Sequence, residues 1–160
     1  MKALVQKDYG QPADLKIEDL PKPEPAEKEV LVKIKATAIN DYDWSMVRGK
    51  PAIYKLLYGF PKPKHPILGM EMSGTVESLG ANATKFKPGE EVFGDISEYG
   101  FGSHAEYLCV NENALIRKPQ CLKHEEASSI PHAAMLAWQS LVEMAGIEKD
   151  QKILINGAGG

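Results

Sequence analysis

Cysteine and clustered positive charge are both scarce in this chain of 160 residues. Its two cysteines, Cys109 and Cys121, are far from any Cys-x-x-Cys spacing, which argues against a disulfide framework and against a zinc site built on thiolates. The 19 Lys and Arg residues are outnumbered by 22 Asp and Glu residues and form no stripe, so we expect neither a nucleic-acid partner nor a membrane surface. The chain also lacks a long apolar run and a secretory signal, and we therefore expect a cytoplasmic protein.

Short strands dominate the first three quarters of the chain. Residues 28–40 alternate between apolar and polar side chains, which is the period of a strand with one buried face. The apolar face of this strand holds Val30, Val32, Ile34 and Ala36. Residues 41–49 predict a short helix, because they contain an Asp that can cap its start and a Gly that can end it. One helical turn is expected at Tyr54–Tyr58. Residues 73–95 and 102–119 predict four further short strands separated by turns.

The pattern changes at residue 124. Residues 124–146 carry apolar side chains at intervals of three and four, which predicts two helices, with Pro131 opening the second and Gly146 ending it. An apolar run at residues 153–155 and a glycine cluster then have the form of a strand that leads into a phosphate-binding turn. This order predicts a mainly β protein: a β-barrel with short helices over residues 1–123, then the first helices and strand of an α/β domain over residues 124–160.

Three stretches, "HPILGMEMSGTVESLG", "FKPGEEVFG" and "ILINGAGG", occur in that order and together resemble the medium-chain dehydrogenase/reductase superfamily. The resemblance extends over essentially the whole chain. It implies an N-terminal GroES-like barrel that forms one wall of a cleft, and a Rossmann domain for NAD(P) that forms the other. Because the chain ends inside the glycine motif, we expect it to be a truncated part of a longer enzyme and to be inactive by itself.

The resemblance also bears on zinc. Zinc-containing members carry a Cys where Asn40 stands here and a His where Met70 stands, before Glu71, and neither replacement is a usual zinc ligand. The cysteines of a structural zinc lobe are absent between Phe93 and Tyr107. We therefore expect no zinc. His132 falls near the position of a third ligand, but we favour a histidine that lines the cleft at a helix start over a degenerate metal site.

The stretches "NDYDWSMVRG" and "IPHAAMLAWQSLVEMAGI" resemble the zinc-free branch that contains quinone oxidoreductases and enone or alkenal reductases. This implies hydride transfer from NADPH, with NADH as an alternative, to a quinone, enone or aldehyde. By its place in this branch, Asn40 is expected to contact the nicotinamide or the substrate, and Tyr42 is a second catalytic candidate as a phenolic donor. From the residues alone, the favoured interpretation of Asn40 is a turn residue that closes a strand, and only the resemblance favours a functional role.

Further candidates surround this position. A flat substrate would suit Trp44, Tyr54 and Phe60 by stacking, and His132 by lining the cleft, although packing at the barrel edge explains the aromatic residues equally well. The glycines of the final turn are expected to let the backbone approach a cofactor pyrophosphate; they are Gly157, Gly159 and Gly160. Apolar residues on the second helix, Leu136, Trp138 and Leu141 among them, predict self-association into a homo-oligomer.

Two alternatives stay open at this stage. One is a zinc-dependent alcohol dehydrogenase with divergent ligands. The other is a stand-alone GroES-like binding module that acts without a cofactor. The length of the natural reading frame distinguishes the binding module from an enzyme. A frame that continues beyond residue 160 with alternating strands and helices would indicate an enzyme.

Overall fold

The computed structural model describes residues 1–157, in which strands predominate up to residue 117 and helices follow. The strands are β1 (Lys2–Val5), β2 (Lys16–Asp19), β3 (Glu29–Thr37), β4 (Glu71–Leu79), β5 (Glu91–Asp95), β6 (Tyr107–Asn111) and β7 (Ile116–Arg117). The helices are η1 (Pro12–Asp14), α1 (Asp41–Arg48), α2 (Ile53–Tyr58), η2 (Glu112–Ala114), α3 (His124–Ser128), α4 (Pro131–Trp138) and η3 (Gln139–Met144). The expected strand-rich first part and helical second part are thus confirmed.

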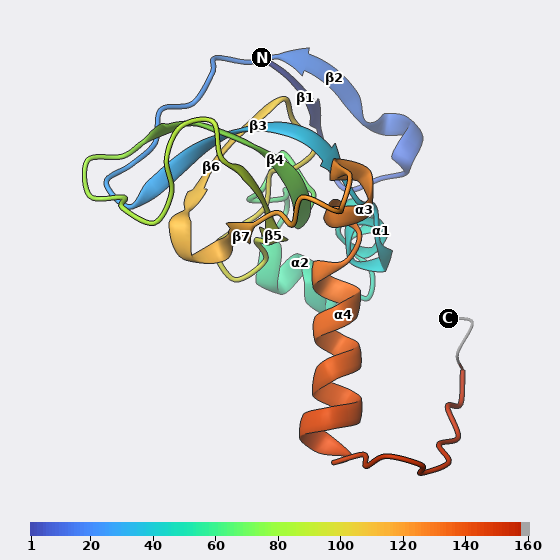
Figure 1. The fold of residues 1–160 in the computed structure, drawn as a ribbon. Coiled ribbons are helices and arrows are strands. Elements are labelled where there is room, and N and C mark those ends of the chain that lie inside the picture. Colours follow the sequence, from blue (N-terminus) through green and yellow to red (C-terminus); the bar gives the residue numbers. More distant parts are fainter. Residues whose placement is uncertain (158–160) are drawn as a thin grey trace.

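Five strands form an antiparallel sheet in the order β6-β3-β4-β5-β7, and β1 and β2 form a separate antiparallel pair. Strand β1 is bonded to the segments that precede β4 and β6: Gln6 N donates to Pro66 O and Leu4 N donates to His104 O. The larger sheet curves around one core, as Figure 1 shows. Two register shifts in β3, at Leu31/Val32 and Ile34/Ala36, contribute to this curvature. The result is the expected β-barrel with short helices.

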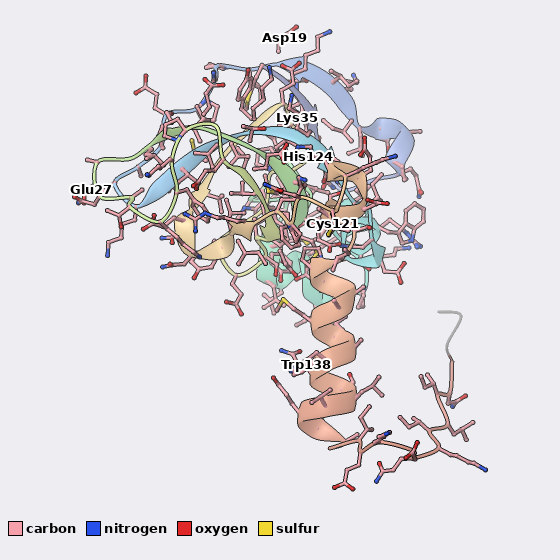
Figure 2. All side chains as sticks on the ribbon, viewed as in Figure 1. Asp19, Glu27, Lys35, Cys121, His124 and Trp138 are labelled. Atoms are coloured by element: carbon pink, nitrogen blue, oxygen red, sulfur yellow. The ribbon has the colours of Figure 1, made fainter. Side chains whose placement is uncertain are left out.

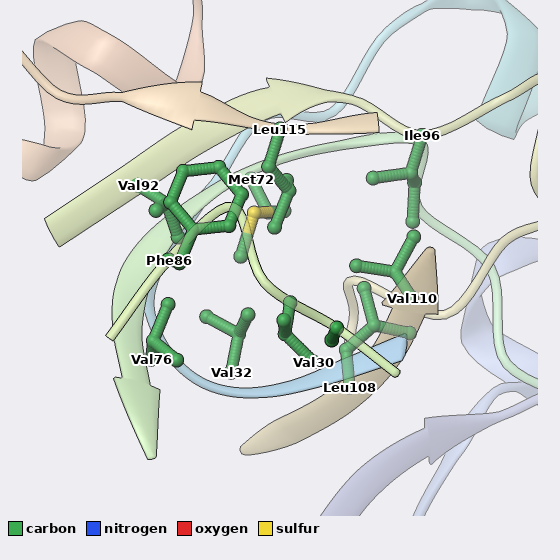
Figure 3. Close-up of a cluster of buried hydrophobic side chains, with 11 residues drawn as sticks. Val30, Val32, Met72, Val76, Phe86, Val92, Ile96, Leu108, Val110 and Leu115 are labelled. Atoms are coloured by element: carbon green, nitrogen blue, oxygen red, sulfur yellow. The ribbon is translucent and has the colours of Figure 1, made fainter. Parts of the chain in front are cut away.

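The core is formed by apolar side chains that point inward from the strands (Figure 3). Val30 and Val32 are fully buried, as the alternation of β3 predicted, and Met72 of β4 packs between them and β5. The other members of this cluster are Val76, Ala83, Phe86, Val92, Ile96, Leu108, Val110 and Leu115. Burial of this set supplies the main driving force for folding of the barrel.

Helix α1 follows β3 directly, and its cap differs from the expectation. We expected an Asp to cap this helix, but the N-cap is Asn40, whose side chain accepts from the N–H groups of Tyr42 and Asp43. Asp43 closes the capping box by accepting from Asn40 N. Asn and Asp are nearly equal as N-caps, so only the geometry of the strand end decides between them. Gly49 ends the helix with φ 58°, as expected.

The C-terminal helices differ in their relation to the barrel. Helix α3 packs against β3, β4 and β5, whereas α4 and η3 continue as one helix that extends away from the barrel (Figure 1). Figure 2 shows Trp138 on this extension. Met135, Leu136, Trp138, Val142 and Met144 are exposed, and Leu141 is half-buried. The expected apolar exposure is confirmed for Leu136 and Trp138. No helix within residues 1–157 is both long and apolar enough to cross a membrane.

The expected strand at residues 153–155 is wrong for this structure. Ile153, Leu154 and Ile155 pair with no strand among residues 1–157 and are exposed to solvent. The physical reason is that a strand needs a neighbour to bond its N–H and C=O groups, and the barrel strands lie at the other end of the α4–η3 helix (Figure 1). Gly157 forms a turn with φ 77°, while Gly159 and Gly160 lie outside the described residues.

Two methionines provide a matched test of this core. Met72 is 0% exposed in the barrel and Met144 is 83% exposed on η3. We expect Met72→Ala to lower the free energy of unfolding by about 2–5 kcal/mol, because it removes buried apolar surface and leaves a cavity. Met144→Ala should change it by less than about 0.5 kcal/mol. Urea unfolding of the two variants checks the difference, and equal effects would contradict the placement of Met72.

Candidate functional site

Asn40 lies at the junction of β3 and α1 with most of its amide committed. Its Oδ1 atom accepts from Tyr42 N at 3.0 Å and from Asp43 N at 3.3 Å. Its Nδ2 atom donates to Glu71 Oε2 at 3.4 Å. Because a side-chain amide has two acceptor sites and two donor hydrogens, one Nδ2 hydrogen is left over. Asn40 can therefore offer a single hydrogen bond, as a donor, to a bound molecule.

Asp43 holds the helix to the loop before β4. This side chain is buried, and its Oδ1 atom accepts from Gly69 N at 3.0 Å while its Oδ2 atom accepts from Asn40 N at 3.1 Å. A side chain cannot replace hydrogen at Gly69, because φ is 94° there and a Cβ would lie 2.2 Å from Ser103 Oγ. The backbone around Asn40 is thus fixed from both sides.

Glu71 joins the barrel to α4. Its carboxylate is buried, and its Oε1 atom accepts from His132 N at 2.8 Å. Asp95 is the cross-strand partner of Glu71 in the β4–β5 pair, and its Oδ2 atom lies 2.8 Å from His132 Nδ1. Two neighbouring acidic side chains therefore hold the backbone and the ring of one histidine.

Most of the donor atoms near the expected zinc position are engaged in other contacts. Asn40 Oδ1 and both oxygens of Glu71 accept hydrogen bonds from N–H groups. His132 Nδ1 faces Asp95, so His132 could offer a metal only its Nε2 atom. Met70 is a buried thioether, which is not a usual zinc ligand. Within residues 1–157 no group of three or more His, Cys, Asp and Glu side chains is arranged to hold a metal ion. The donor atoms present therefore do not fit zinc.

Tyr42 belongs to an aromatic cluster. Its ring stacks on Phe101 at 5.9 Å and meets Tyr54 edge-on at 5.4 Å, and its hydroxyl group is hydrogen-bonded to that of Tyr58. Burial first, and then the bond to Tyr58, raise the pKa of Tyr42 well above its ordinary value. Any tyrosine is protonated near neutral pH, and the raised pKa extends this protonated state of Tyr42 to more alkaline pH.

The other aromatic candidates are not gathered in one place. Tyr54 lies in the cluster just described. Trp44 is 45% exposed and lines an apolar cavity of about 290 Å³ with Ile39 and Leu68. Phe60 is 80% exposed. Of the residues expected to contact substrate, only His132 joins Asn40 at Glu71.

A second histidine repeats the arrangement one helix earlier. His124 Nδ1 lies 2.7 Å from Ser73 Oγ of β4, and His124 Nε2 lies 3.0 Å from Glu91 Oε1 of β5. Lys118 Nζ contacts the other Glu91 oxygen at 3.1 Å, and its hydrogen bond lowers the pKa of Glu91. Figure 2 shows His124 against the barrel. The beginnings of α3 and α4 are each attached to the β4–β5 pair through a histidine.

The sequence interpretation missed Glu71 and Asp95 as partners of His132, and Tyr58 and Phe101 as partners of Tyr42. The only signal for Glu71 was its place beside Met70, where it was weighed as a metal ligand. Asp95 ends a short strand and carried no signal, because cross-strand pairing joins residues 24 positions apart only once the register is known.

Comparison with known proteins points to one family. Residues 26–120 match the alcohol dehydrogenase GroES-like domain. The chain is 35% identical to the mitochondrial NAD(P)H oxidoreductase RTN4IP1 of Dictyostelium discoideum, over 100% of this chain and 46% of that protein. It is 36% identical to the 2-methylene-furan-3-one reductase of Solanum lycopersicum, over 100% of this chain and 42% of that protein.

The fold has a close counterpart among solved structures. The quinone oxidoreductase from Coxiella burnetii superposes with a TM-score of 0.82 at 30% identity, over 94% of this chain and 47% of that one. The chain thus spans about half the length of the proteins it matches.

The partly buried phenol of Tyr42 predicts an alkaline effect on stability. Because its pKa is raised above the ordinary tyrosine value of 10.0, its contribution to stability is complete below pH 10 and is lost as pH rises through the higher folded value. We expect the free energy of unfolding to fall above pH 10, and to fall less steeply in Tyr42→Phe. Urea unfolding between about pH 8 and pH 11.5 measures this slope. Tyr99→Phe, at an exposed tyrosine, is the control and should keep the wild-type slope; a Tyr42→Phe slope equal to wild type would refute the assignment.

Proposed function

The chain belongs to the alcohol dehydrogenase GroES-like family within the medium-chain dehydrogenase/reductase superfamily, and from this membership we propose that it is the N-terminal catalytic part of an NAD(P)H-dependent oxidoreductase. The proposed reaction is hydride transfer to a quinone, an enone or an alkenal, without zinc. Residues 1–123 would form the catalytic domain, and residues 124–160 would begin the nucleotide-binding domain. The observation that carries this proposal is the single free donor of the Asn40 amide at the barrel end of α4.

Such a reaction needs a donor where negative charge develops. A bound dihydronicotinamide would supply the hydride, and an enone or quinone that accepts it gains negative charge on oxygen. A hydrogen-bond donor that is already fixed in place stabilises that charge without reorganisation. Asn40 meets this requirement, because its Oδ1 atom caps α1 and one Nδ2 hydrogen is held by Glu71. Tyr42 is the second candidate donor, through a phenol that is protonated at neutral pH and is hydrogen-bonded to Tyr58.

The proposal excludes zinc on the chemistry of the donors. Both oxygens of Glu71 accept from N–H groups, so a zinc ion would have to break these bonds to gain Glu71 as a ligand. A neutral amide and a thioether, from Asn40 and Met70, are weak replacements for thiolate and imidazole. The polarising role of a metal would fall instead to the Asn40 donor.

The cofactor would contact both parts of the protein. We propose NADP in preference to NAD by analogy with the branch, with Gly157, Gly159 and Gly160 approaching the pyrophosphate and Asn40 near the nicotinamide. Trp44, Tyr54, Phe60 and His132 remain proposed substrate contacts. We further propose that residues 1–160 alone neither bind NADPH at micromolar concentration nor turn over substrate. A homo-oligomer and a cytoplasmic location complete the proposal.

Asn40→Ser tests the donor. Ser is also a good N-cap, so the variant should fold, yet its short hydroxyl group cannot reach the place of the Nδ2 atom. We expect kcat/KM of the full-length enzyme with an enone to fall about 100-fold, the usual effect of losing one such donor. Asn111→Ser is the matched control, because Asn111 caps η2 through Asn113 N at 3.0 Å. Equal activities of the two variants would reject the role of Asn40.

Metal removal tests the absence of zinc. We expect EDTA dialysis to leave the activity of the full-length enzyme unchanged, because no step requires a metal ion. Elemental analysis should find well below one zinc per chain. Stoichiometric zinc, removed together with the activity, would instead favour a zinc-dependent alcohol dehydrogenase with divergent ligands.

A further inference from the structure

We propose that Glu71 is a positioning residue whose single carboxylate fixes both the free donor of Asn40 and the start of α4, so that the Asn40 amide and α4 keep one relative placement. The catalytic consequence of this inference rests on the proposed function. The structural part, a carboxylate shared between Asn40 and His132, stands on the geometry alone.

The first half of the inference concerns α4, which has no cap of its own. Its N-cap residue Ile130 makes no side-chain capping bond, and Pro131 at the first helical position has no N–H group. The N–H of His132 is therefore the first donor of the helix without a local acceptor. Glu71 Oε1 accepts from it at 2.8 Å, and a carboxylate at this end also interacts favourably with the helix dipole.

The second half concerns Asn40. With Oδ1 bound to two backbone N–H groups, only the Nδ2 side of the amide can respond to its surroundings. Glu71 Oε2 takes one of the two Nδ2 hydrogens at 3.4 Å. The remaining hydrogen then points in a direction set by the amide plane, so the position of the carboxylate determines where Asn40 donates.

Glu71 is itself held firmly. It is 3% exposed, and its backbone carbonyl accepts from Thr37 Oγ1 at 2.8 Å, which in turn lies 2.7 Å from Ser103 Oγ. Its cross-strand partner Asp95 binds the ring of the same His132 at 2.8 Å. A buried carboxylate in a fixed network interacts more strongly than an exposed one, so movement of α4 is transmitted to Asn40 and the reverse.

Glu71→Gln separates the two contacts. The amide of glutamine has one acceptor atom and one donor atom. Its oxygen can still accept from His132 N, but its nitrogen then faces Asn40 Nδ2, donor against donor. We expect the variant in the full-length enzyme to fold and to lose at least tenfold in kcat, with the KM for NADPH within threefold of wild type, because misplacement of a catalytic group mainly affects the chemical step.

A double-mutant cycle shows whether Glu71 acts through Asn40. In the Asn40→Ser background, Glu71→Gln should cause less than a twofold further change, because the group that Glu71 positions is already gone. Additive effects in the cycle would overturn the inference. Glu91→Gln is the matched control: Glu91 binds His124 at 3.0 Å on the same strand pair but does not contact Asn40, and its kcat should stay within twofold of wild type.

A readout without chemistry separates this inference from the proposed function. Hydrogen exchange of the His132 amide in the full-length protein should be little changed by Glu71→Gln and much faster in Glu71→Ala, which removes the acceptor. The side-chain NMR signals of Asn40 should shift in both variants. Unchanged Asn40 signals would overturn the inference even if hydride transfer is found. Shifted Asn40 signals in a protein that reduces no quinone, enone or alkenal would uphold Glu71 as a positioning residue and reject the proposed function. If Glu71→Gln does not fold, Glu71→Asp takes its place. It keeps the charge but is too short to reach both partners, so we expect shifted Asn40 signals, faster exchange of the His132 amide and at least a tenfold loss in kcat; unchanged Asn40 signals would overturn the inference.

Discussion

The arrangement of the barrel and α4 depends on one hydrogen bond, from the N–H group of His132 at the start of α4 to the carboxylate of Glu71. A helix that begins with proline lacks one donor and exposes the next, and here the acceptor comes from β4, 61 residues earlier in the chain. The same carboxylate also bonds the amide that caps α1. One buried acidic side chain therefore connects the end of β3, the start of β4 and the start of the helix that leaves the barrel.

The regular elements could be predicted from the sequence because they follow from local chemistry. The alternation that buries Val30 and Val32 defines β3, and Pro131 and Gly146 bound the second C-terminal helix. The ordered motifs that resemble the superfamily also indicate the barrel. The local patterns act over a few residues, and the motifs can be compared directly with those of a known family, so neither kind of signal requires knowledge of the tertiary structure.

The connections between elements could not be predicted in the same way. Asn40, expected as a catalytic amide or a turn residue, is also the helix cap, and this follows from how β3 ends. Glu71 and Asp95 meet at His132 only because of the β4–β5 register. Residues 153–155 show that local composition is not sufficient to predict a strand. They are apolar, as expected for a strand, but they pair with no strand among residues 1–157.

The two histidine attachments have a consequence for the modularity of the protein. Lys118, His124 and His132 all contact the β4–β5 pair. The segment from residue 118 to residue 132 is therefore attached to the barrel, although its helices begin at residue 124. A chimera that joins this barrel to the C-terminal part of a related protein should therefore be spliced after His132. A splice at residue 123 would separate both histidines from the acidic residues that hold them.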